Sequence, residues 1–167
     1  MPLIELIGLK TYFYTKAGVI RAVDGVDFAI EKGRTLGVVG ESGCGKSITA
    51  LSIMGLVQTP PGRIVSGEIR YHRNQGDQAR EEVINLERLN PRGRKMRSIR
   101  GNEIAMIFQE PMTSLNPVFT IGNQLMEAIS LHQHLDGKEL RNRAIEMLRV
   151  VGIPRADEVI DEYPHRF

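Results

Sequence analysis

Eight consecutive residues combine glycines, a lysine and a hydroxyl in an order that suits phosphate binding. They read Gly40-Glu41-Ser42-Gly43-Cys44-Gly45-Lys46-Ser47, which fits the pattern G-x-x-x-x-G-K-[ST]. Glycines permit backbone conformations that turn successive N–H groups inward, and these groups form a concavity for phosphate oxygens. Lys46 is placed to reach the β- and γ-phosphates of a nucleotide, and the Ser47 hydroxyl can complete the oxygen shell of a Mg²⁺ ion. The run therefore predicts a phosphate-binding loop.

The alternative interpretation of this run is a glycine turn between a strand and a helix, without a ligand. The surrounding sequence favours binding. An apolar stretch suited to a strand precedes the loop, and the apolar helix pattern that follows adds the partial positive charge of a helix N-terminus. By itself the loop indicates only a broad class of nucleotide binders, since GTPases, kinases and transport ATPases share it.

Several short elements must hold this loop in place. Strands are expected where apolar residues run together or alternate with polar ones, at residues 3–9, 19–30, 36–39 and 64–71. A hairpin turn at residues 16–18 joins the first two. An apolar helix is expected from Lys46 to Val57, and Thr59-Pro60-Pro61-Gly62 is expected to end it. These elements place the loop between the strand at residues 36–39 and the helix.

Past residue 109 the pattern changes from strand-like to helical. Residues 104–108 form a compact apolar run that predicts one more strand, and beyond it apolar residues recur at helical spacing in two sets. The sets are Ile121, Leu125, Met126 and Ile129, then Leu140, Ala144, Ile145, Leu148 and Val151. Asp136 and Glu139 form a capping-box pattern at the start of the second helix, and Gly152 is expected to end it. The chain thus reads as a β-rich α/β portion followed by a helical portion.

Composition excludes several classes of protein. The 167 residues are 41% hydrophobic and 25% charged, as in ordinary globular domains. No stretch approaches the roughly 18 apolar residues that a membrane span requires. The single cysteine, Cys44, excludes an internal disulfide and a multi-cysteine zinc site. The N-terminal residues lack a secretory-signal pattern, which predicts a chain that stays in the cytoplasm.

A basic run from Arg88 to Arg100 leaves two interpretations open. It can contact nucleic acid or a membrane surface, or it can be the solvated face of a variable insert. Interspersed glutamates favour the solvated face because they dilute the positive charge. The net charge of +2 is also too small to suggest nucleic acid as a partner, and none is expected.

Three stretches of this sequence resemble the ATP-binding subunits of ABC transporters, in particular the dipeptide and oligopeptide importer group. Val38-Val39-Gly40-Glu41-Ser42-Gly43-Cys44-Gly45-Lys46-Ser47 resembles the Walker A motif of that group. Ile104-Ala105-Met106-Ile107-Phe108-Gln109-Glu110-Pro111-Met112-Thr113-Ser114-Leu115-Asn116-Pro117 resembles its Q-loop, and the run P-M-T-S-L-N-P is specific to the group. Tyr163-Pro164-His165-Arg166-Phe167 is similar to the residues just before the ABC signature. The similarity extends from residue 3 to residue 167.

The resemblance implies an α/β fold, that of an ABC-type P-loop NTPase, in incomplete form. An antiparallel β subdomain with the Walker A strand, loop and helix is expected over residues 1–109. Part of the helical subdomain, with the Q-loop, is expected over residues 110–167, ending just before the signature motif. The ligands that the resemblance implies are ATP, bound by residues 40–47, and Mg²⁺, bound near Ser47 and Gln109.

Two further site residues are implied by the resemblance. Gln109 would be the Q-loop glutamine, a catalytic-site residue that senses the Mg²⁺ and γ-phosphate region and couples it to the transport channel. The alternative for Gln109 is a glutamine at a strand end that bonds to backbone. Phe13 would stack on adenine, with Tyr12 and Tyr14 on the opposite face of the strand. The alternative for Phe13 is an aromatic residue packed in the core.

The function implied by the resemblance is that of the ATP-binding component of an ABC importer, which couples ATP binding and hydrolysis to the uptake of peptides or related solutes. Its partners would be transmembrane permease subunits, a second ABC ATPase subunit and, indirectly, a substrate-binding protein, at the cytoplasmic face of the cell membrane. The sequence lacks a signature motif, a Walker B aspartate and the catalytic glutamate, so we expect the chain alone to hydrolyse ATP poorly and interpret it as truncated or as a fragment. The alternatives are a non-catalytic nucleotide-binding fragment and an ABC ATPase that acts on nucleic acid or ribosomes.

Overall fold

The structure is a computed structural model of the 167-residue chain, and it describes residues 2–74, 81–108 and 114–166. The chain divides into two compact units, Met1–Met106 and Ile107–Phe167. Each unit has a hydrophobic core of its own.

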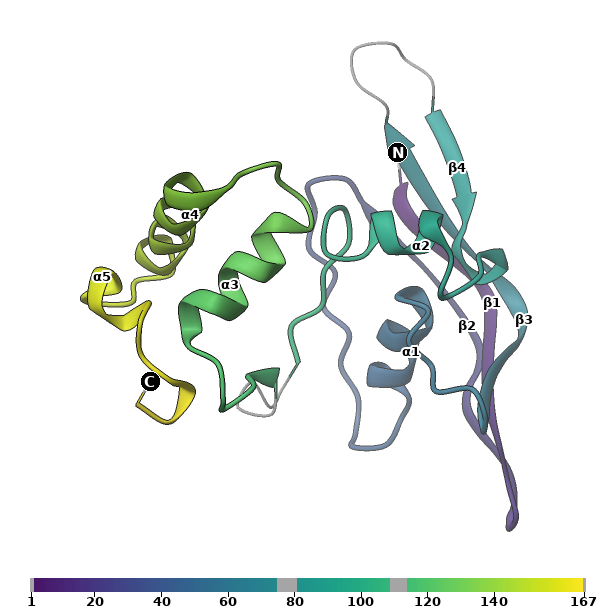
Figure 1. The fold of residues 1–167 in the computed structure, drawn as a ribbon. Coiled ribbons are helices and arrows are strands. Elements are labelled where there is room, and N and C mark those ends of the chain that lie inside the picture. Colours follow the sequence, from purple (N-terminus) through teal and green to yellow (C-terminus); the bar gives the residue numbers. More distant parts are fainter. Residues whose placement is uncertain (1, 75–80, 109–113, 167) are drawn as a thin grey trace. The chain divides into compact units, whose positions relative to one another are not determined.

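The first unit is built on a four-stranded antiparallel sheet with the strand order β2-β1-β3-β4 (Figure 1). The strands are β1 (Pro2–Thr15), β2 (Gly18–Glu31), β3 (Gly62–Asn74) and β4 (Glu81–Asn85). β1 and β2 form one long hairpin, whose pairing runs from Pro2 opposite Glu31 to Thr15 opposite Gly18. The strands predicted at residues 3–9, 19–30 and 64–71 and the turn between the first two are confirmed.

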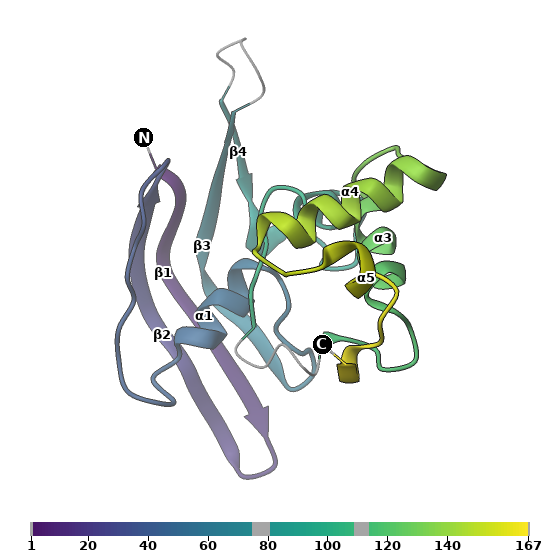
Figure 2. The same cartoon turned by 90° about the vertical axis from the view of Figure 1, so that its left-hand side faces the viewer.

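Two short helices lie on one face of this sheet, α1 (Lys46–Ile53) and α2 (Arg94–Ile99), and a 3-10 turn, η1 (Leu86–Arg88), follows β4 (Figures 1 and 2). The core between the sheet and the helices contains Leu6, Leu9 and Ile69 from the strands and Met96 and Ile99 from α2. α1 is also attached to β1 by a buried hydrogen bond of 2.9 Å between the hydroxyls of Thr11 and Ser52. Ile48 and Ile53 of α1 pack against this core, so the core and the hydrogen bond together fix the helix that follows the phosphate loop.

Helix α1 ends four residues earlier than the sequence suggests, at Ile53 instead of Val57. Gly55 adopts the left-handed conformation with φ 58°, and the N–H of Leu56 donates to the carbonyl of Leu51 at 2.8 Å. This is the Schellman arrangement, in which a glycine just beyond a helix ends it. Gly55 was the signal in the sequence, and the prolines at residues 60–61 come after the helix has already ended.

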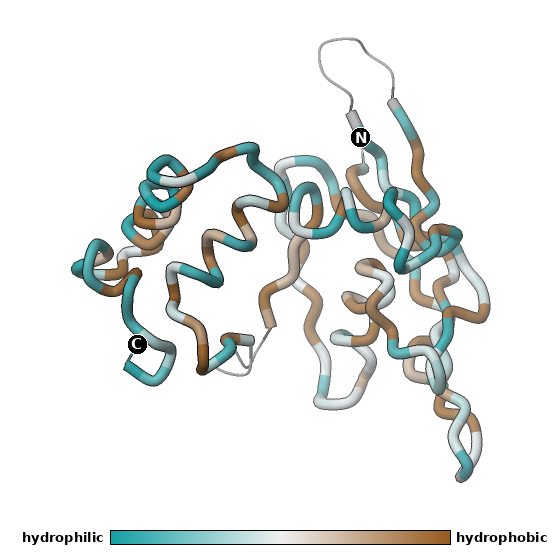
Figure 3. The backbone as a smooth tube through the Cα atoms, viewed as in Figure 1, coloured by the Kyte–Doolittle hydropathy of each residue, from teal (hydrophilic) through white to brown (hydrophobic). Residues whose placement is uncertain are grey.

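Two predicted strands are not formed. Residues 34–41 and 105–108 have no regular structure, and in the second run only Ile104 makes an isolated bridge, with Arg100. Val39 is 93% exposed and Ile107 is 97% exposed, although Figure 3 shows residues 104–108 as a hydrophobic stretch. An apolar run of this kind becomes a strand only when a neighbouring strand satisfies its N–H and C=O groups and layers cover its faces. Among the described residues neither run has such a neighbour.

The second unit consists of helices α3 (Ile121–Ser130), α4 (Gly137–Val150) and α5 (Ala156–Val159) and a 3-10 turn, η3 (Pro164–Arg166). Both predicted helices are confirmed, and Gly152, with φ 79°, follows the second one as expected. The buried core comprises Ile121, Ala144, Ile145, Leu148, Ala156 and Ile160. Val151, which the spacing groups with these residues, is the C-cap of α4 and is 72% exposed. None of the helices in the described ranges is long and apolar enough to cross a membrane.

Helix α3 is held at its N-terminus by a side-chain cap and by the backbone at the end of α5. The hydroxyl of Thr120 accepts the N–H of Asn123 at 3.2 Å, while the N–H of Gly122 donates to the carbonyl of Ile160 at 2.7 Å. A Cβ on Gly122 would lie 2.6 Å from Ile160, so glycine is needed for this approach. The capping box predicted for α4 is wrong. Asp136 occupies the N-cap position, but its side chain makes no capping bond.

Candidate nucleotide-binding site

The phosphate loop, residues 40–47, is anchored to the sheet at Gly45, which is the N-cap of α1. Gly45 has φ 96°, in the left-handed region that residues with a side chain rarely adopt. A Cβ at this position would also collide with the carbonyl oxygen of Ala22 in β2. Glycine at position 45 therefore lets the loop contact the backbone of the sheet, and this contact sets where α1 begins.

The ammonium group of Lys46 lies within the curve of the loop. Its Nζ donates to the carbonyl oxygens of Gly40 at 2.6 Å and Glu41 at 2.7 Å, and it lies 3.3 Å from the Sγ atom of Cys44. The charge is thus held at the centre of the loop, where the pattern requires it. A phosphate oxygen is a better acceptor for an ammonium than a neutral carbonyl, because the hydrogen bond is then charge-assisted on both sides.

Two glycines of the loop, Gly40 and Gly43, are required for different reasons. A Cβ on Gly40 would lie 2.7 Å from Cys44 Sγ and 3.9 Å from Lys46 Nζ, so a side chain there would fill the interior of the loop. Gly43 has φ 83°, and a Cβ added to it would meet nothing within 4 Å, so glycine is required there for its conformation alone. Glu41, Ser42, Gly43 and Cys44 are all exposed. The loop is therefore open to solvent at residues 41–44 and holds one ammonium group that can meet an anion.

The first turn of α1 supplies the residue expected near a metal ion. Ser47 is exposed next to Lys46, and its hydroxyl fits the role of one oxygen ligand of Mg²⁺, with phosphate and water oxygens as the others. This turn is reinforced by Thr49, whose N–H and hydroxyl both donate to the carbonyl of Gly45, at 2.9 and 3.0 Å. The position of Ser47 is thereby fixed relative to the loop.

An apolar hollow of about 380 Å³ lies beside the loop in the first unit. Its walls come from β2, from α1 and from residues 36–39, the run that the sequence predicts as a strand. Lys46, Cys44 and Gly45 border it. The phosphate loop therefore has a polar interior and an apolar flank.

Phe13 lies on β1, opposite Ile20 of β2 and Gly62 of β3. The ring is half-buried and lies against Gly62, because a Cβ on that glycine would come within 2.7 Å of it. Val57, which follows α1, contacts the same glycine position. Phe13 is thus on the strand that carries Thr11, the residue bonded to α1, and its stacking on a base stays a prediction.

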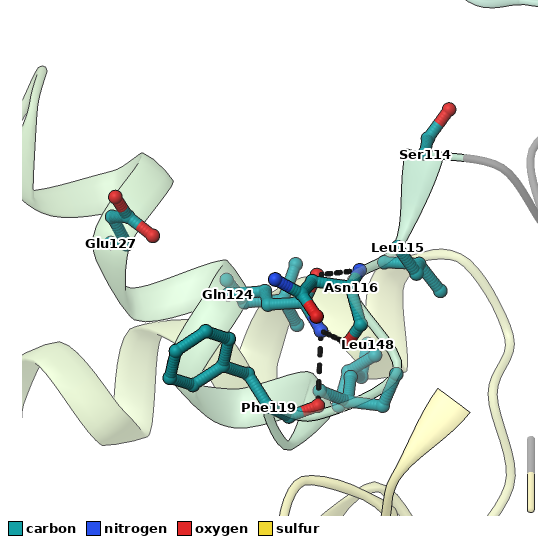
Figure 4. Close-up of a pocket in the computed structure, with 9 residues that line it drawn as sticks. Ser114, Leu115, Asn116, Phe119, Gln124, Glu127 and Leu148 are labelled. Carbon is teal, nitrogen blue, oxygen red and sulfur yellow. Dashed lines mark hydrogen bonds between the residues drawn. The ribbon is translucent and has the colours of Figure 1, made fainter. Parts of the chain in front are cut away.

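Gln109 lies outside the described residues, so its predicted role stays a prediction. Three described residues of the Q-loop stretch, Ser114 to Asn116, line a cavity of about 650 Å³ within the second unit (Figure 4). Gln124 of α3 holds this stretch. Its Oε1 accepts the N–H of Asn116 at 2.8 Å, and its Nε2 donates to the carbonyls of Asn116 at 3.0 Å and Phe119 at 3.1 Å. Sequence reasoning missed Gln124, although a glutamine on a helix shortly after a polar loop was a visible signal.

The basic run matches the solvated-face interpretation except at its end. Arg88, Arg92, Arg94, Lys95 and Arg97 are exposed or half-exposed. Two of them have acidic partners, since Arg88 lies 3.2 Å from Glu87 and Lys95 lies 2.7 Å from Glu82. Arg100 is half-buried and bonds to the end of α1, so it is not part of this face.

A second polar cluster joins β3 to the segment after α2. The buried Tyr71 hydroxyl donates to Glu103 Oε2 at 3.0 Å, and Arg73 donates to Glu103 Oε1 at 2.6 Å. Burial, followed by the hydrogen bond to Glu103, raises the pKa of Tyr71 above its ordinary value. The carboxylate of Glu103 thus holds the segment after α2 on the sheet.

A family model described as ABC transporter matches residues 23–167. The oligopeptide transport ATP-binding protein AppD of Bacillus subtilis is 51% identical over 164 residues, which are 98% of this chain and 46% of that protein. The glutathione import ATP-binding protein GsiA of Pectobacterium atrosepticum is 44% identical over 163 residues, which are 98% of this chain and 25% of that protein. The chain spans about half the length, or less, of these relatives.

Solved structures show the same fold. A dimeric structure of the ATP-binding cassette MJ0796 in a post-hydrolysis state, bound to ADP and Pi, has a TM-score of 0.75 and 22% sequence identity. The match covers 98% of this chain and 62% of that chain. A second dimeric structure of MJ0796, described as a bacterial ABC transporter cassette, has a TM-score of 0.74. The predicted fold class, part of an ABC-type cassette, is thereby confirmed.

Proposed function

Because the chain belongs to the ABC transporter family, we propose that it binds MgATP as part of the ATP-binding component of an importer for peptides or related solutes. The observation that carries this proposal is the geometry of the phosphate loop, with Lys46 Nζ held inside it by two carbonyl oxygens at 2.6 and 2.7 Å. The names of the relatives, which refer to oligopeptide transport and glutathione import, support an importer of small peptides.

In this proposal the described residues bind and orient the nucleotide. Backbone N–H groups of residues 40–47 and the N-terminus of α1 surround a phosphate, and Lys46 neutralises part of its charge. Ser47 contributes one oxygen to Mg²⁺, and the bound ion offsets further phosphate charge. Phe13 is proposed to stack on the base. Gln109, outside the described residues, is proposed to follow the γ-phosphate and the metal ion.

Hydrolysis and transport are proposed for the protein as a whole, and nucleotide binding for residues 1–167. The partners in this proposal are a second ATPase subunit, transmembrane permease subunits and, through the permease, a substrate-binding protein. The dimeric form of the solved cassettes supports the second subunit. We place the assembly at the cytoplasmic face of the cell membrane, with this chain as a peripheral component.

The test is nucleotide affinity of the chain with and without the loop lysine. We expect Lys46→Met to weaken MgATP binding by about 10- to 100-fold, since hydrogen bonds to charged groups contribute about 1.5–3 kcal/mol each. The matched control is Lys32→Met, which removes an exposed lysine from the turn after β2. Fluorescence of a labelled ATP analogue reports the dissociation constant, and circular dichroism confirms that both variants are folded. Equal affinities of the two variants, or a wild-type chain that binds no nucleotide, would refute the proposal.

A further inference from the structure

Arg100 connects the end of α1 to the segment that follows α2. Its Nε donates to the carbonyl oxygen of Met54 at 2.7 Å, and its Nη2 donates to the carbonyl oxygen of Gly55 at 2.8 Å. These residues are the C-cap of α1 and the glycine that ends it. The side chain thus reaches across 46 and 45 positions of sequence to the helix that begins at the phosphate loop.

The contact suits the chemistry of both partners. The last carbonyls of a helix have no hydrogen-bond partner within the helix and carry partial negative charge. A cationic donor at this end supplies the missing hydrogen bonds and offsets the charge. Arg100 is half-buried, so its charge is partly removed from water, and this burial lowers the pKa of the guanidinium group. A Cβ on Gly55 would lie 3.0 Å from the guanidinium and 3.2 Å from Met96 Cε. Glycine at position 55 therefore leaves room for the arginine as well as ending the helix.

The backbone around Arg100 forms a tight turn that extends this connection. The N–H of Gly101 donates to the carbonyl of Ile104 at 2.9 Å, and the N–H of Ile104 donates to the carbonyl of Ile99 at 3.0 Å. Ile99 is buried in the core of the first unit. At the opposite end of α1, about 12 Å away for an eight-residue helix, lie Lys46 and Ser47. The turn and the loop residues are thus attached to the two ends of one rigid element.

We propose that Arg100 is a positioning residue for the phosphate loop. Its guanidinium fixes the C-terminal end of α1, so that the helix presents Lys46 and Ser47 in one orientation and transmits nucleotide binding to the turn at residues 100–104. The proposal rests on the nucleotide-binding function proposed above. Arg100 would thus have a function that the exposed residues of the basic run do not share.

The experiment compares three variants of the 167-residue chain. Arg100→Met keeps an apolar stem but removes every donor, Arg100→Lys keeps the charge without the fork of two donors, and Arg97→Met removes an exposed arginine from the same segment. We expect the dissociation constant for MgATP to rise about fivefold in Arg100→Met, within the range of known coupling effects, less in Arg100→Lys and not at all in Arg97→Met. The affinity is measured where circular dichroism shows each variant folded, because lost stability alone does not change the affinity of folded molecules.

A second measurement uses the wild-type chain and covers the case in which Arg100→Met fails to fold. Hydrogen exchange at the amides of Gly101 and Ile104 should slow when MgATP binds, although neither lies in the loop. Equal affinities in Arg100→Met and Arg97→Met, or unchanged exchange at these amides on saturation with MgATP, would overturn the inference while leaving nucleotide binding intact. A wild-type chain that binds no MgATP refutes the proposed function, and the inference with it.

Discussion

Substituting the glycines around the phosphate loop separates the two reasons for which glycine is required there. Gly45 has a left-handed backbone and a neighbouring carbonyl in the space of a Cβ. Gly43 has the left-handed backbone, with φ 83°, and open space around it. Gly37, in the run before the loop, has open space and a φ outside that region. Alanine at position 45 therefore meets both a conformational and a steric penalty. Alanine at position 43 meets the conformational penalty alone, and alanine at position 37 meets neither.

The expected free energies of unfolding follow from these penalties. A left-handed conformation costs an L-residue about 1–2 kcal/mol, and forcing a methyl group against packed backbone costs about 1–3 kcal/mol. Alanine also restricts the unfolded chain, which stabilises the protein by about 0.4–1 kcal/mol. We expect Gly37→Ala to be neutral or slightly stabilising, Gly43→Ala to destabilise by about 1 kcal/mol, and Gly45→Ala to destabilise by about 2–4 kcal/mol.

Urea denaturation followed by tyrosine fluorescence measures this series. The chain has no tryptophan, and three of its four tyrosines, Tyr12, Tyr14 and Tyr71, lie on β1 and β3 of the first unit. Gly45→Ala should also weaken MgATP binding more than Gly43→Ala, since the methyl group displaces the loop from β2. If Gly45→Ala and Gly43→Ala unfold with the same free energy, contact with the carbonyl of Ala22 does not fix the loop. If both match Gly37→Ala, the conformational argument is refuted as well.

Three further outcomes test other parts of the structure. Thr11→Val and Ser52→Ala should each lower the free energy of unfolding in urea by about 1 kcal/mol. The double variant should lose less than the sum of the two, because the two hydroxyls bond to each other. Strict additivity would contradict this. Because the pKa of Tyr71 is raised in the folded protein, its hydroxyl loses a proton at lower pH in the unfolded chain than in the folded one. The free energy of unfolding should therefore fall as the pH rises above the ordinary pKa of 10.0. Tyr71→Phe should show a flatter fall in urea titrations at alkaline pH, and an unchanged slope would disprove the assignment. Alkylation of Cys44 by N-ethylmaleimide should block MgATP binding and MgATP should slow the alkylation, since Sγ lies 3.3 Å from Lys46 Nζ; Cys44→Ser is the control, and an alkylated chain with normal affinity would count against the site.

Features with a local signal could be predicted from the sequence. The alternation over residues 19–30 and the turn at residues 16–18 indicated the β1–β2 hairpin, because strand pairing across a short turn involves neighbouring residues. The spacing of apolar residues from Ile121 to Ile129 indicated α3 for a similar reason. The phosphate loop belongs to the same class, since its glycines, lysine and helix are contiguous in the chain.

Features that depend on distant residues could not be predicted in this way. The runs at residues 36–39 and 104–108 have the composition of buried strands, but a strand also needs a neighbour, and local sequence does not report whether one is present. The supports of the site are also nonlocal. Ser52 bonds to Thr11, 41 residues away, and Arg100 bonds to Met54, 46 residues away. Neither pairing has a sequence pattern that identifies it.

The contacts that hold the phosphate loop, within the described residues, all come from the first unit. None of them involves residues 36–39, the run predicted as a strand before the loop. Gly45 rests on Ala22 of β2, Ser52 bonds to Thr11 of β1, and Arg100 holds the end of α1, whereas Val39 is 93% exposed. The loop and α1 are therefore positioned from the side of the antiparallel sheet and α2. Substitutions at these three contacts should change nucleotide affinity more than polar substitutions at residues 36–39, because only the former move the helix that carries Lys46 and Ser47.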